Sequence, residues 1–284
     1  TMQNIRLGAL ALMTILLTAL SAVAYADNIL VEKDIAYGAA PRQKLDIYAP
    51  QGLKALKPVL IFIHGGGWQR GDKSSAEKHG TFYAEKGAVF ISINYRLSPK
   101  DKHPAQAEDS AAAVKWVYDN IHQYGGNKHS IHIAGHSAGA HLAALIATDE
   151  RYLAAHSLSP LLFKSVIPND TASYDFSTPL VIGKRLVQPK IDATFGTTPQ
   201  KIKAASPISY VQDNKNLPPF ICFVTGKRPD AVAQTHAFTA AIKTASGQSE
   251  THIIDGLSHR EMNQAMSDPA SPLAQRVLKA LWEQ

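Results

Sequence analysis

Ser137 lies between two glycines, in the order Gly135-His136-Ser137-Ala138-Gly139. A serine hydroxyl is a weak nucleophile until a neighbouring base takes its proton. When such a serine occupies a sharp turn between a strand and a helix, small residues two positions before and after it relieve the crowding. The apolar residues 131–134 precede this motif and the helix-forming residues 140–147 follow it. We therefore expect Ser137 to be an activated nucleophile on such a turn.

A glycine-rich run follows the apolar residues 59–63, in the order His64-Gly65-Gly66-Gly67-Trp68. Backbone N–H groups can stabilise the negative charge that develops on a carbonyl oxygen under nucleophilic attack. Glycines leave these groups uncovered, so we expect the three glycines to form an oxyanion hole together with the N–H of Ala138. His64 is expected to brace the loop and Trp68 to contact the substrate. Taken alone, the run would equally fit an ordinary glycine turn.

A histidine must act as the base that activates Ser137. For a serine on this kind of strand-to-helix turn, the expected order along the chain is nucleophile, acid, histidine. Three histidines follow Ser137 at a useful distance. His236 falls on a predicted helix, and His252 falls inside a predicted strand. His259 comes in a loop directly after that strand, at the sheet edge where a base is needed. We therefore assign His259 as the base.

The acid should follow the strand predicted at residues 220–225, which makes Asp230 the candidate to orient His259 and stabilise its charged form. Asp255 is too close to His259 along the chain to bridge to it comfortably. Glu250 stands at the wrong end of its strand. The alternative interpretation of Asp230 is a carboxylate in a surface turn.

Short β-branched and aromatic runs alternate with helical patterns along most of the chain, which predicts an α/β fold. We expect a mostly parallel central sheet flanked by helices, with residues 29–37 and 45–49 forming early antiparallel strands. Residues 59–63 are apolar without interruption, as expected of a strand buried on both faces. Residues 170–206 break the alternation, and we interpret them as a small cap or lid insertion.

The first 26 residues have the composition of a secretory signal. Arg6 precedes the apolar residues 7–24, and Ala24-Tyr25-Ala26 gives the small-x-small pattern before a cleavage point. The alternative is an uncleaved anchor, because the apolar run approaches the ~20 residues that span a bilayer. We expect one domain over residues 27–284, located in the periplasm or secreted, without stable membrane insertion after signal removal. Cys222 is the single cysteine, so no internal disulfide can form.

The charge pattern argues against nucleic-acid binding. The formal net charge is +6, but the basic residues are scattered and no run of five occurs, whereas nucleic-acid binding requires a clustered basic surface. The chain also lacks an H-E-x-x-H metal motif and a phosphate-binding P-loop. We therefore expect no metal, no cofactor and a small-molecule substrate.

Beyond these motifs, further blocks of the chain match a known group of enzymes, namely Gly71-Asp72-Lys73, Tyr95-Arg96-Leu97, Ser206-Pro207-Ile208-Ser209-Tyr210 and Pro218-Pro219. With them, residues 44–259 resemble the esterase/lipase branch of the α/β-hydrolase fold. This branch includes hormone-sensitive-lipase-like carboxylesterases, feruloyl and acetylxylan esterases, and kynurenine-formamidase-like enzymes. The resemblance implies a triad of Ser137, Asp230 and His259 and a glycine oxyanion hole.

Three departures refine the resemblance. His136 stands where hormone-sensitive-lipase-like members usually carry Asp, which favours the feruloyl-esterase-like and formamidase-like groups. Gly67 stands where formamidases often have Tyr, which favours an esterase. The turn that carries Asp230 is one residue longer than the commonest spacing in the family.

The sequence thus predicts a serine carboxylic ester hydrolase that forms an acyl-enzyme with short-to-medium acyl or aryl esters. One alternative is an arylformamidase, an amide hydrolase that would use the same triad. The other is a non-catalytic binding protein on a hydrolase scaffold, although such proteins usually lose a triad residue.

Overall fold

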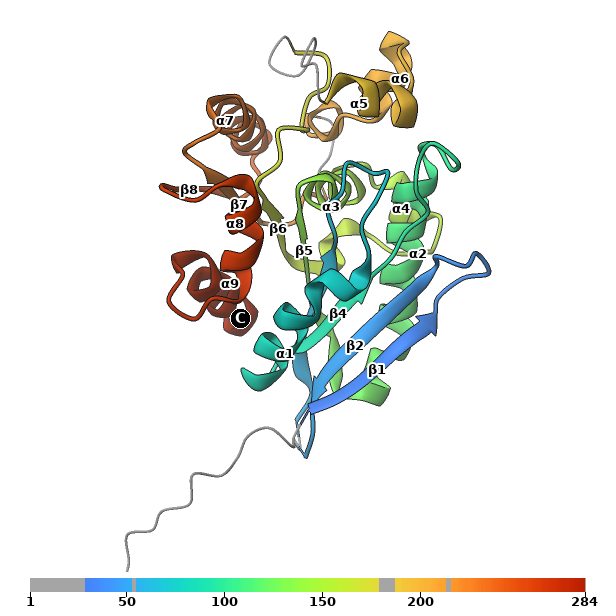
Figure 1. Ribbon diagram of the computed structural model, residues 1–284, viewed down its shortest axis with the longest axis vertical. Helices are drawn as coiled ribbons and strands as arrows, with labels where there is room; N and C mark the ends of the chain where they lie inside the picture. The colour runs from blue at the N-terminus through green and yellow to red at the C-terminus, as the bar shows by residue number, and fades with distance from the viewer. Residues whose placement is uncertain (1–28, 53–54, 179–186, 213–215, 284) are drawn as a thin grey trace, which may run out of the picture.

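The computed structural model describes residues 29–52, 55–178, 187–212 and 216–283. A single central sheet runs through the molecule (Figure 1). Its eight strands are β1 (Ile29–Ala36), β2 (Lys44–Pro50), β3 (Lys57–Ile63), β4 (Val89–Ile93), β5 (Gly126–His136), β6 (Phe163–Asn169), β7 (Phe220–Thr225) and β8 (Ser249–Ile254).

The strands lie in the order β1-β2-β4-β3-β5-β6-β7-β8. β1 pairs antiparallel with β2, and β2 pairs antiparallel with β4. All later neighbours pair in parallel. The predictions of an α/β fold with a mostly parallel sheet and antiparallel first strands are confirmed.

Helices cover both faces of the sheet. They are α1 (Glu77–Glu85), α2 (Ala105–Asn120), α3 (Ala138–Thr148), α4 (Arg151–Ala154), α5 (Gln188–Phe195), α6 (Pro199–Ala204), α7 (Pro229–Thr244), α8 (His259–Gln264) and α9 (Pro272–Trp282). Short 3₁₀ turns are η2 (Lys73–Ala76), η3 (Ile121–Tyr124), η4 (Pro160–Leu162), η5 (Pro207–Tyr210) and η6 (Ala265–Ser267). Apolar side chains of α2, α3 and α7 pack in one core cluster, and those of α1, α8 and α9 pack in another. Buried apolar residues on both faces explain the uninterrupted apolar strands.

The strand register brings three loops together at one edge of the sheet. Ile63 pairs with Gly135, and His136 pairs with Asn169. The glycine loop after β3, the turn after β5 and the residue after β6 therefore leave the sheet side by side. In parallel sheets this carboxyl edge is where ligands bind.

The predicted cap, residues 170–206, is described only in part, because residues 179–186 lie outside the described ranges. Its described remainder contains α5 and α6, which lie together beyond α3 (Figure 1). Phe176 and Phe195 are nearly fully buried and pack against each other. The described part of this segment is thus anchored to the core of the domain.

The expected signal, residues 1–26, also lies outside the described ranges. Among the helices that the structure describes, none combines the length and apolar character needed to cross a bilayer. Cys222 is fully buried and belongs to the core.

Four histidines are almost completely buried, and all four hold a neutral imidazole at neutral pH. Burial lowers the pKa of His64, His79 and His132 to about 4. Burial lowers the pKa of His141 to about 3. An unfolded histidine has a pKa near 6.5, so between these values the unfolded chain binds protons that the folded chain does not.

We therefore expect stability to be complete above pH 6.5 and to fall as the pH drops towards 4. Each histidine contributes about 1.4 kcal/mol per pH unit to the loss of stability. The four together contribute on the order of 5 kcal/mol per unit, which is comparable to the whole stability of a small domain. Urea unfolding at pH 7.5, 6.5 and 5.5 measures this loss. The variant His79→Phe should show a shallower pH dependence. Equal stability at all three pH values would contradict the prediction.

Candidate active site

Ser137 occupies a strained turn between β5 and α3. Its φ of 56° and ψ of −117° place a non-glycine residue in a rarely populated backbone region. A Cβ at Gly135 would lie 2.4 Å from the carbonyl of Gly139, and one at Gly139 would lie 2.0 Å from the carbonyl oxygen of Ile63. The two glycines are required because the backbone leaves no room for larger residues, as the sequence motif predicts.

The glycine loop lies directly beside this turn. A Cβ at Gly65 would come within 3.2 Å of the Ser137 Cβ atom. Gly66 and Gly67 have φ values of 124° and 60°, which favour glycine. Among the described residues, no backbone acceptor pairs with the N–H groups of Gly66, Gly67 or Ala138. These groups are therefore available to an oxyanion next to Ser137.

His64 holds the start of this loop, as expected. Its ring stacks on Tyr95 with 4.5 Å between ring centroids, and the Tyr95 hydroxyl donates to the His64 carbonyl oxygen at 3.0 Å. Burial keeps the pKa of His64 low, so the ring is neutral at working pH.

Trp68 lines a cavity that Ser137 and the glycine loop also line, but only 3% of its surface is exposed. Its indole Nε1 donates to His141 Nδ1 at 3.1 Å, and its ring packs edge-on against Phe176 and Phe195. The indole thus forms a rigid wall beside the glycine loop. The predicted contact with substrate remains a prediction.

His259 is the first residue of α8, just beyond the loop that follows β8. Ser258 caps this helix, and its backbone N–H donates to Glu261 Oε2 at 2.7 Å. The histidine lines the same cavity as Ser137. This capping arrangement fixes the histidine at the carboxyl edge of the sheet.

The carboxylate that contacts His259 is Asp170, not Asp230. His259 Nδ1 lies 2.5 Å from Asp170 Oδ2. Asp170 directly follows β6, at the edge of the sheet next to the Ser137 turn. Asp230 lies in the first turn of α7 and lines the cavity. The prediction of Asp230 as the partner of the base is therefore wrong, because the turn after β6 reaches the imidazole.

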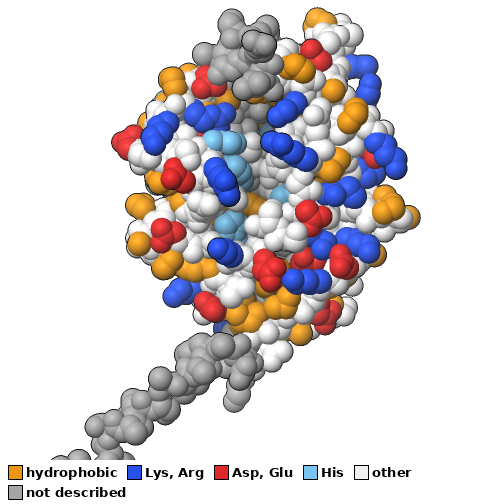
Figure 2. Space-filling model, viewed as in Figure 1, with side chains coloured by type: hydrophobic (Ala, Val, Ile, Leu, Met, Phe, Trp, Pro, Cys, Tyr) orange, Lys and Arg blue, Asp and Glu red, His pale blue; other side chains and the backbone are white. Residues whose placement is uncertain are grey.

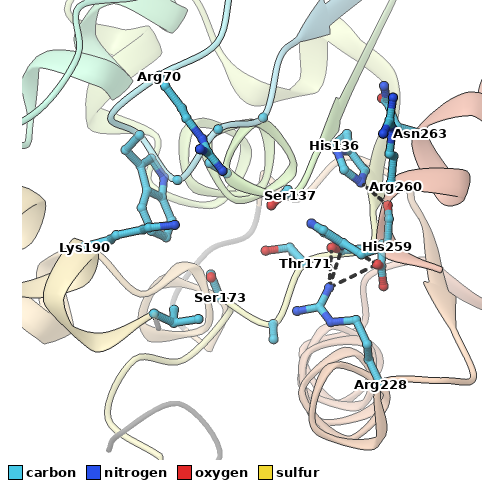
Figure 3. A pocket seen from close by; sticks show the side chains of 18 of the residues that line it. Arg70, His136, Ser137, Thr171, Ser173, Lys190, Arg228, His259, Arg260 and Asn263 are labelled. Carbon is cyan, nitrogen blue, oxygen red and sulfur yellow. Dashed lines mark hydrogen bonds and ion pairs between the residues drawn. The ribbon is translucent and has the colours of Figure 1, made fainter. Parts of the chain in front are cut away.

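Asp170 is held by several groups at once. Its Oδ1 accepts from the Thr225 backbone at 3.2 Å, and its own N–H donates to the Phe223 carbonyl at 2.8 Å. Arg228 Nη1 lies 3.0 Å from Oδ2 and 2.9 Å from His259 Nδ1, because both nitrogens face one carboxylate oxygen (Figure 3). Burial opposes ionisation, but the His259 hydrogen bond and the Arg228 charge outweigh it and lower the Asp170 pKa. The group is thus an ionised carboxylate.

The position of Asp170 in the sequence is itself a signal for a catalytic acid. Asp170 comes directly after a short apolar strand, as a catalytic acid should. It is also the first residue of the segment interpreted as a cap. Asp230 comes shortly after β7, where the sequence analysis expects the catalytic acid, so spacing along the chain favours Asp230 over Asp170.

His136 braces the base from the other side. Its Nε2 donates to the His259 backbone carbonyl at 2.8 Å, and the two rings lie 4.5 Å apart. Burial lowers the His136 pKa to about 3, so this ring stays neutral. One ligand atom from each of His136, Asp170 and His259 lies within 4.8 Å of the others, close enough to hold a metal ion. The hydrogen bonds described above already join these three residues to one another.

Ser137, the glycine loop and His259 line one cavity of about 530 Å³. Figure 3 shows Ser137, His259 and Arg228 among the side chains that line this cavity. Ser137 and His259 both lie in the described part of the chain, and no hydrogen bond joins Ser137 Oγ to the His259 ring. The distance between a catalytic serine and its base is commonly long when no substrate is bound. The site combines a strained serine, an imidazole–carboxylate pair and uncovered N–H groups, which is the equipment for acyl transfer.

Comparison with known proteins supports this chemistry. The family model described as BD-FAE matches residues 45–241. Esterase LipQ from Mycobacterium tuberculosis is 35% identical over 75% of this chain and 52% of its own length. The probable isoprenylcysteine alpha-carbonyl methylesterase ICMEL1 from Oryza sativa is 38% identical over 39% of this chain and 26% of its own length. The chain thus spans about a quarter to a half of these curated relatives.

Solved structures agree on the fold. Esterase B from Lactobacillus rhamnosis superposes with a TM-score of 0.70 at 21% identity, over 90% of this chain and 86% of that one. At this identity the likeness establishes a shared fold only.

Proposed function

The chain belongs to the BD-FAE family, and on that premise we propose that it is a serine carboxylic ester hydrolase. One observation carries the proposal: Ser137, on its strained turn, shares a cavity with the His259–Asp170 pair and the uncovered N–H groups of the glycine loop. The relatives whose names describe esterases support it.

In the first half of the reaction, Ser137 Oγ attacks the acyl carbon while His259 Nε2 takes its proton. Asp170 accepts from Nδ1 and so leaves Nε2 unprotonated in the neutral ring. It also stabilises the imidazolium that forms. The oxyanion receives hydrogen bonds from Gly66, Gly67 and Ala138, with Gly65 shaping the loop. The C–O bond then breaks, and Nε2 returns its proton to the departing alcohol oxygen.

In the second half, water takes the place of the alcohol. His259 removes a proton from this water, which attacks the acyl-enzyme carbonyl within the same oxyanion hole. The ester bond to Ser137 breaks, Ser137 regains its proton from His259, and the carboxylic acid leaves. Every proton is carried by His259, so these residues complete the cycle by themselves.

The direct test is turnover of p-nitrophenyl acetate and butyrate, followed by release of p-nitrophenol. A fluorophosphonate probe should label Ser137, as peptide mapping would show. Failure of both turnover and labelling would support a non-catalytic binding protein. A kcat/KM for a formylated aniline above that for the short esters would instead favour the arylformamidase.

We also propose that residues 1–26 direct export to the periplasm or medium and are then removed. Their positive start, apolar run and small-x-small end support this proposal. Expression in a bacterial host should give a protein in the periplasmic fraction or medium with Asp27 at its N-terminus. A protein retained in the membrane with residues 1–26 intact would contradict it.

A further inference from the structure

Four basic side chains line the cavity that holds Ser137, namely Arg70, Lys190, Arg228 and Arg260. Two carboxylates line it, Asp170 and Asp230. Figure 2 shows Lys and Arg side chains on both sides of the hollow in which histidines are visible. The cavity wall therefore carries more positive than negative charge.

These four basic side chains differ in whether another group of the protein already pairs with them. Arg228 pairs with the fully buried Asp170 and belongs to the catalytic group. By contrast, the side chains of Arg70 and Lys190 form no ion pair or hydrogen bond with any described part of the chain. Arg260 likewise has no such partner, but it lines a neighbouring depression as well as this cavity. Arg70, Lys190 and Arg260 are thus cations available to a ligand, and Arg70 and Lys190 are the two that lie beside the glycine loop.

Arg70 and Lys190 both lie beside the glycine loop. The Arg70 backbone N–H donates to the Gly66 carbonyl at 3.2 Å and closes the glycine loop. Lys190, from α5, lies over the same loop, because a Cβ at Gly67 would be 3.6 Å from its Nζ. The charged ends of both residues point towards the space in front of Ser137 (Figure 3).

This position determines which half of an ester meets the charges. The departing alcohol oxygen must lie beside His259, which protonates it. The carbonyl oxygen must lie at the glycine loop. Arg70 and Lys190 stand on the side of the site away from His259 (Figure 3), so they flank the acyl half. We propose, given the ester hydrolase function above, that the preferred substrates carry a carboxylate on the acyl half, as monoesters of dicarboxylic acids do.

Two probes that differ by one charge test this inference. They are mono-p-nitrophenyl adipate and its methyl ester, which have the same acyl length. We expect kcat/KM to be about tenfold higher for the charged probe at low salt, with the advantage shrinking as salt screens the charges. Equal rates for the two probes would overturn the inference, while absence of turnover with both would instead overturn the ester hydrolase proposal.

Variants identify the residues responsible. Lys190→Met and Arg70→Met should each reduce the preference several-fold with little loss on the methyl ester, and Lys190→Glu should reverse it. Lys164→Met is the matched control, because Lys164 is exposed near the start of β6 at the opposite sheet edge. A preference that survives both cavity variants would contradict the assignment.

A second probe pair tests the acyl side against the alcohol side. 4-Acetoxybenzoate carries its carboxylate on the leaving group, and its methyl ester does not. We expect less than a threefold difference between these two. A charge preference found only with this pair would overturn the assignment to the acyl half.

Discussion

Replacing Asp170 by Asn should lower kcat for p-nitrophenyl butyrate by about 10⁴-fold, the loss expected when the carboxylate of a serine–histidine–aspartate triad becomes an amide. An amide cannot stabilise the imidazolium of His259, and it can hold the ring in the wrong tautomer. KM should change little, because Asp170 is fully buried behind the histidine. Steady-state kinetics on purified Asp170→Asn measures the loss.

The matched variant is Asp230→Asn, which removes the other carboxylate that lines the cavity. We expect it to lose less than about tenfold in kcat, because it does not orient His259. Since Asp170→Asn leaves Arg228 beside a neutral group, thermal unfolding of both variants must show that they remain folded. A larger kcat loss in Asp230→Asn than in Asp170→Asn would restore Asp230 as the acid.

Replacing Ser137 by Ala has the largest expected effect, a fall in kcat on the order of 10⁶-fold. The acyl-enzyme cannot form without Oγ, and only the contributions of binding and the oxyanion hole remain. The turn itself should tolerate alanine as it tolerates serine, so folding should be little affected. The same ester assay measures the fall, and fluorophosphonate labelling should disappear with it.

Ser173→Ala is the control for Ser137→Ala, because it removes a second hydroxyl from the lining of the same cavity. It should keep labelling and lose less than about tenfold in kcat. If Ser137→Ala retained turnover within a hundredfold of the unchanged protein, the nucleophile would have to be another residue.

The nucleophile turn and the glycine loop could be predicted because their requirements are local. Each is set by a few consecutive residues, and Gly139 stands where a Cβ would meet the Ile63 carbonyl. The parallel sheet could be predicted for a related reason, since strands buried on both faces read as apolar runs. The position of His259 followed from its place just after the last strand.

The acid could not be assigned from local spacing. Asp170 and His259 are 89 residues apart, and β6 and β7 are neighbours in the sheet, so an acid after either strand would satisfy the expected chain order. The choice depends on backbone placement at these ends, where Asp170 bonds to both Phe223 and Thr225. In addition, the sequence pattern of residues 170–206 indicates one irregular insertion, so Asp170, its first residue, is assigned to the cap and not to the catalytic site.

The neighbouring ends of β6 and β7 offer an evolutionary route for exchanging the acid. If a carboxylate after either strand reached the same imidazole, an ancestor with both would remain active while either was lost. In this chain the acid is Asp170 after β6, and the turn after β7 contributes the cation Arg228 to the same carboxylate. Distant relatives could thus share an identical reaction while their acids align to different strands.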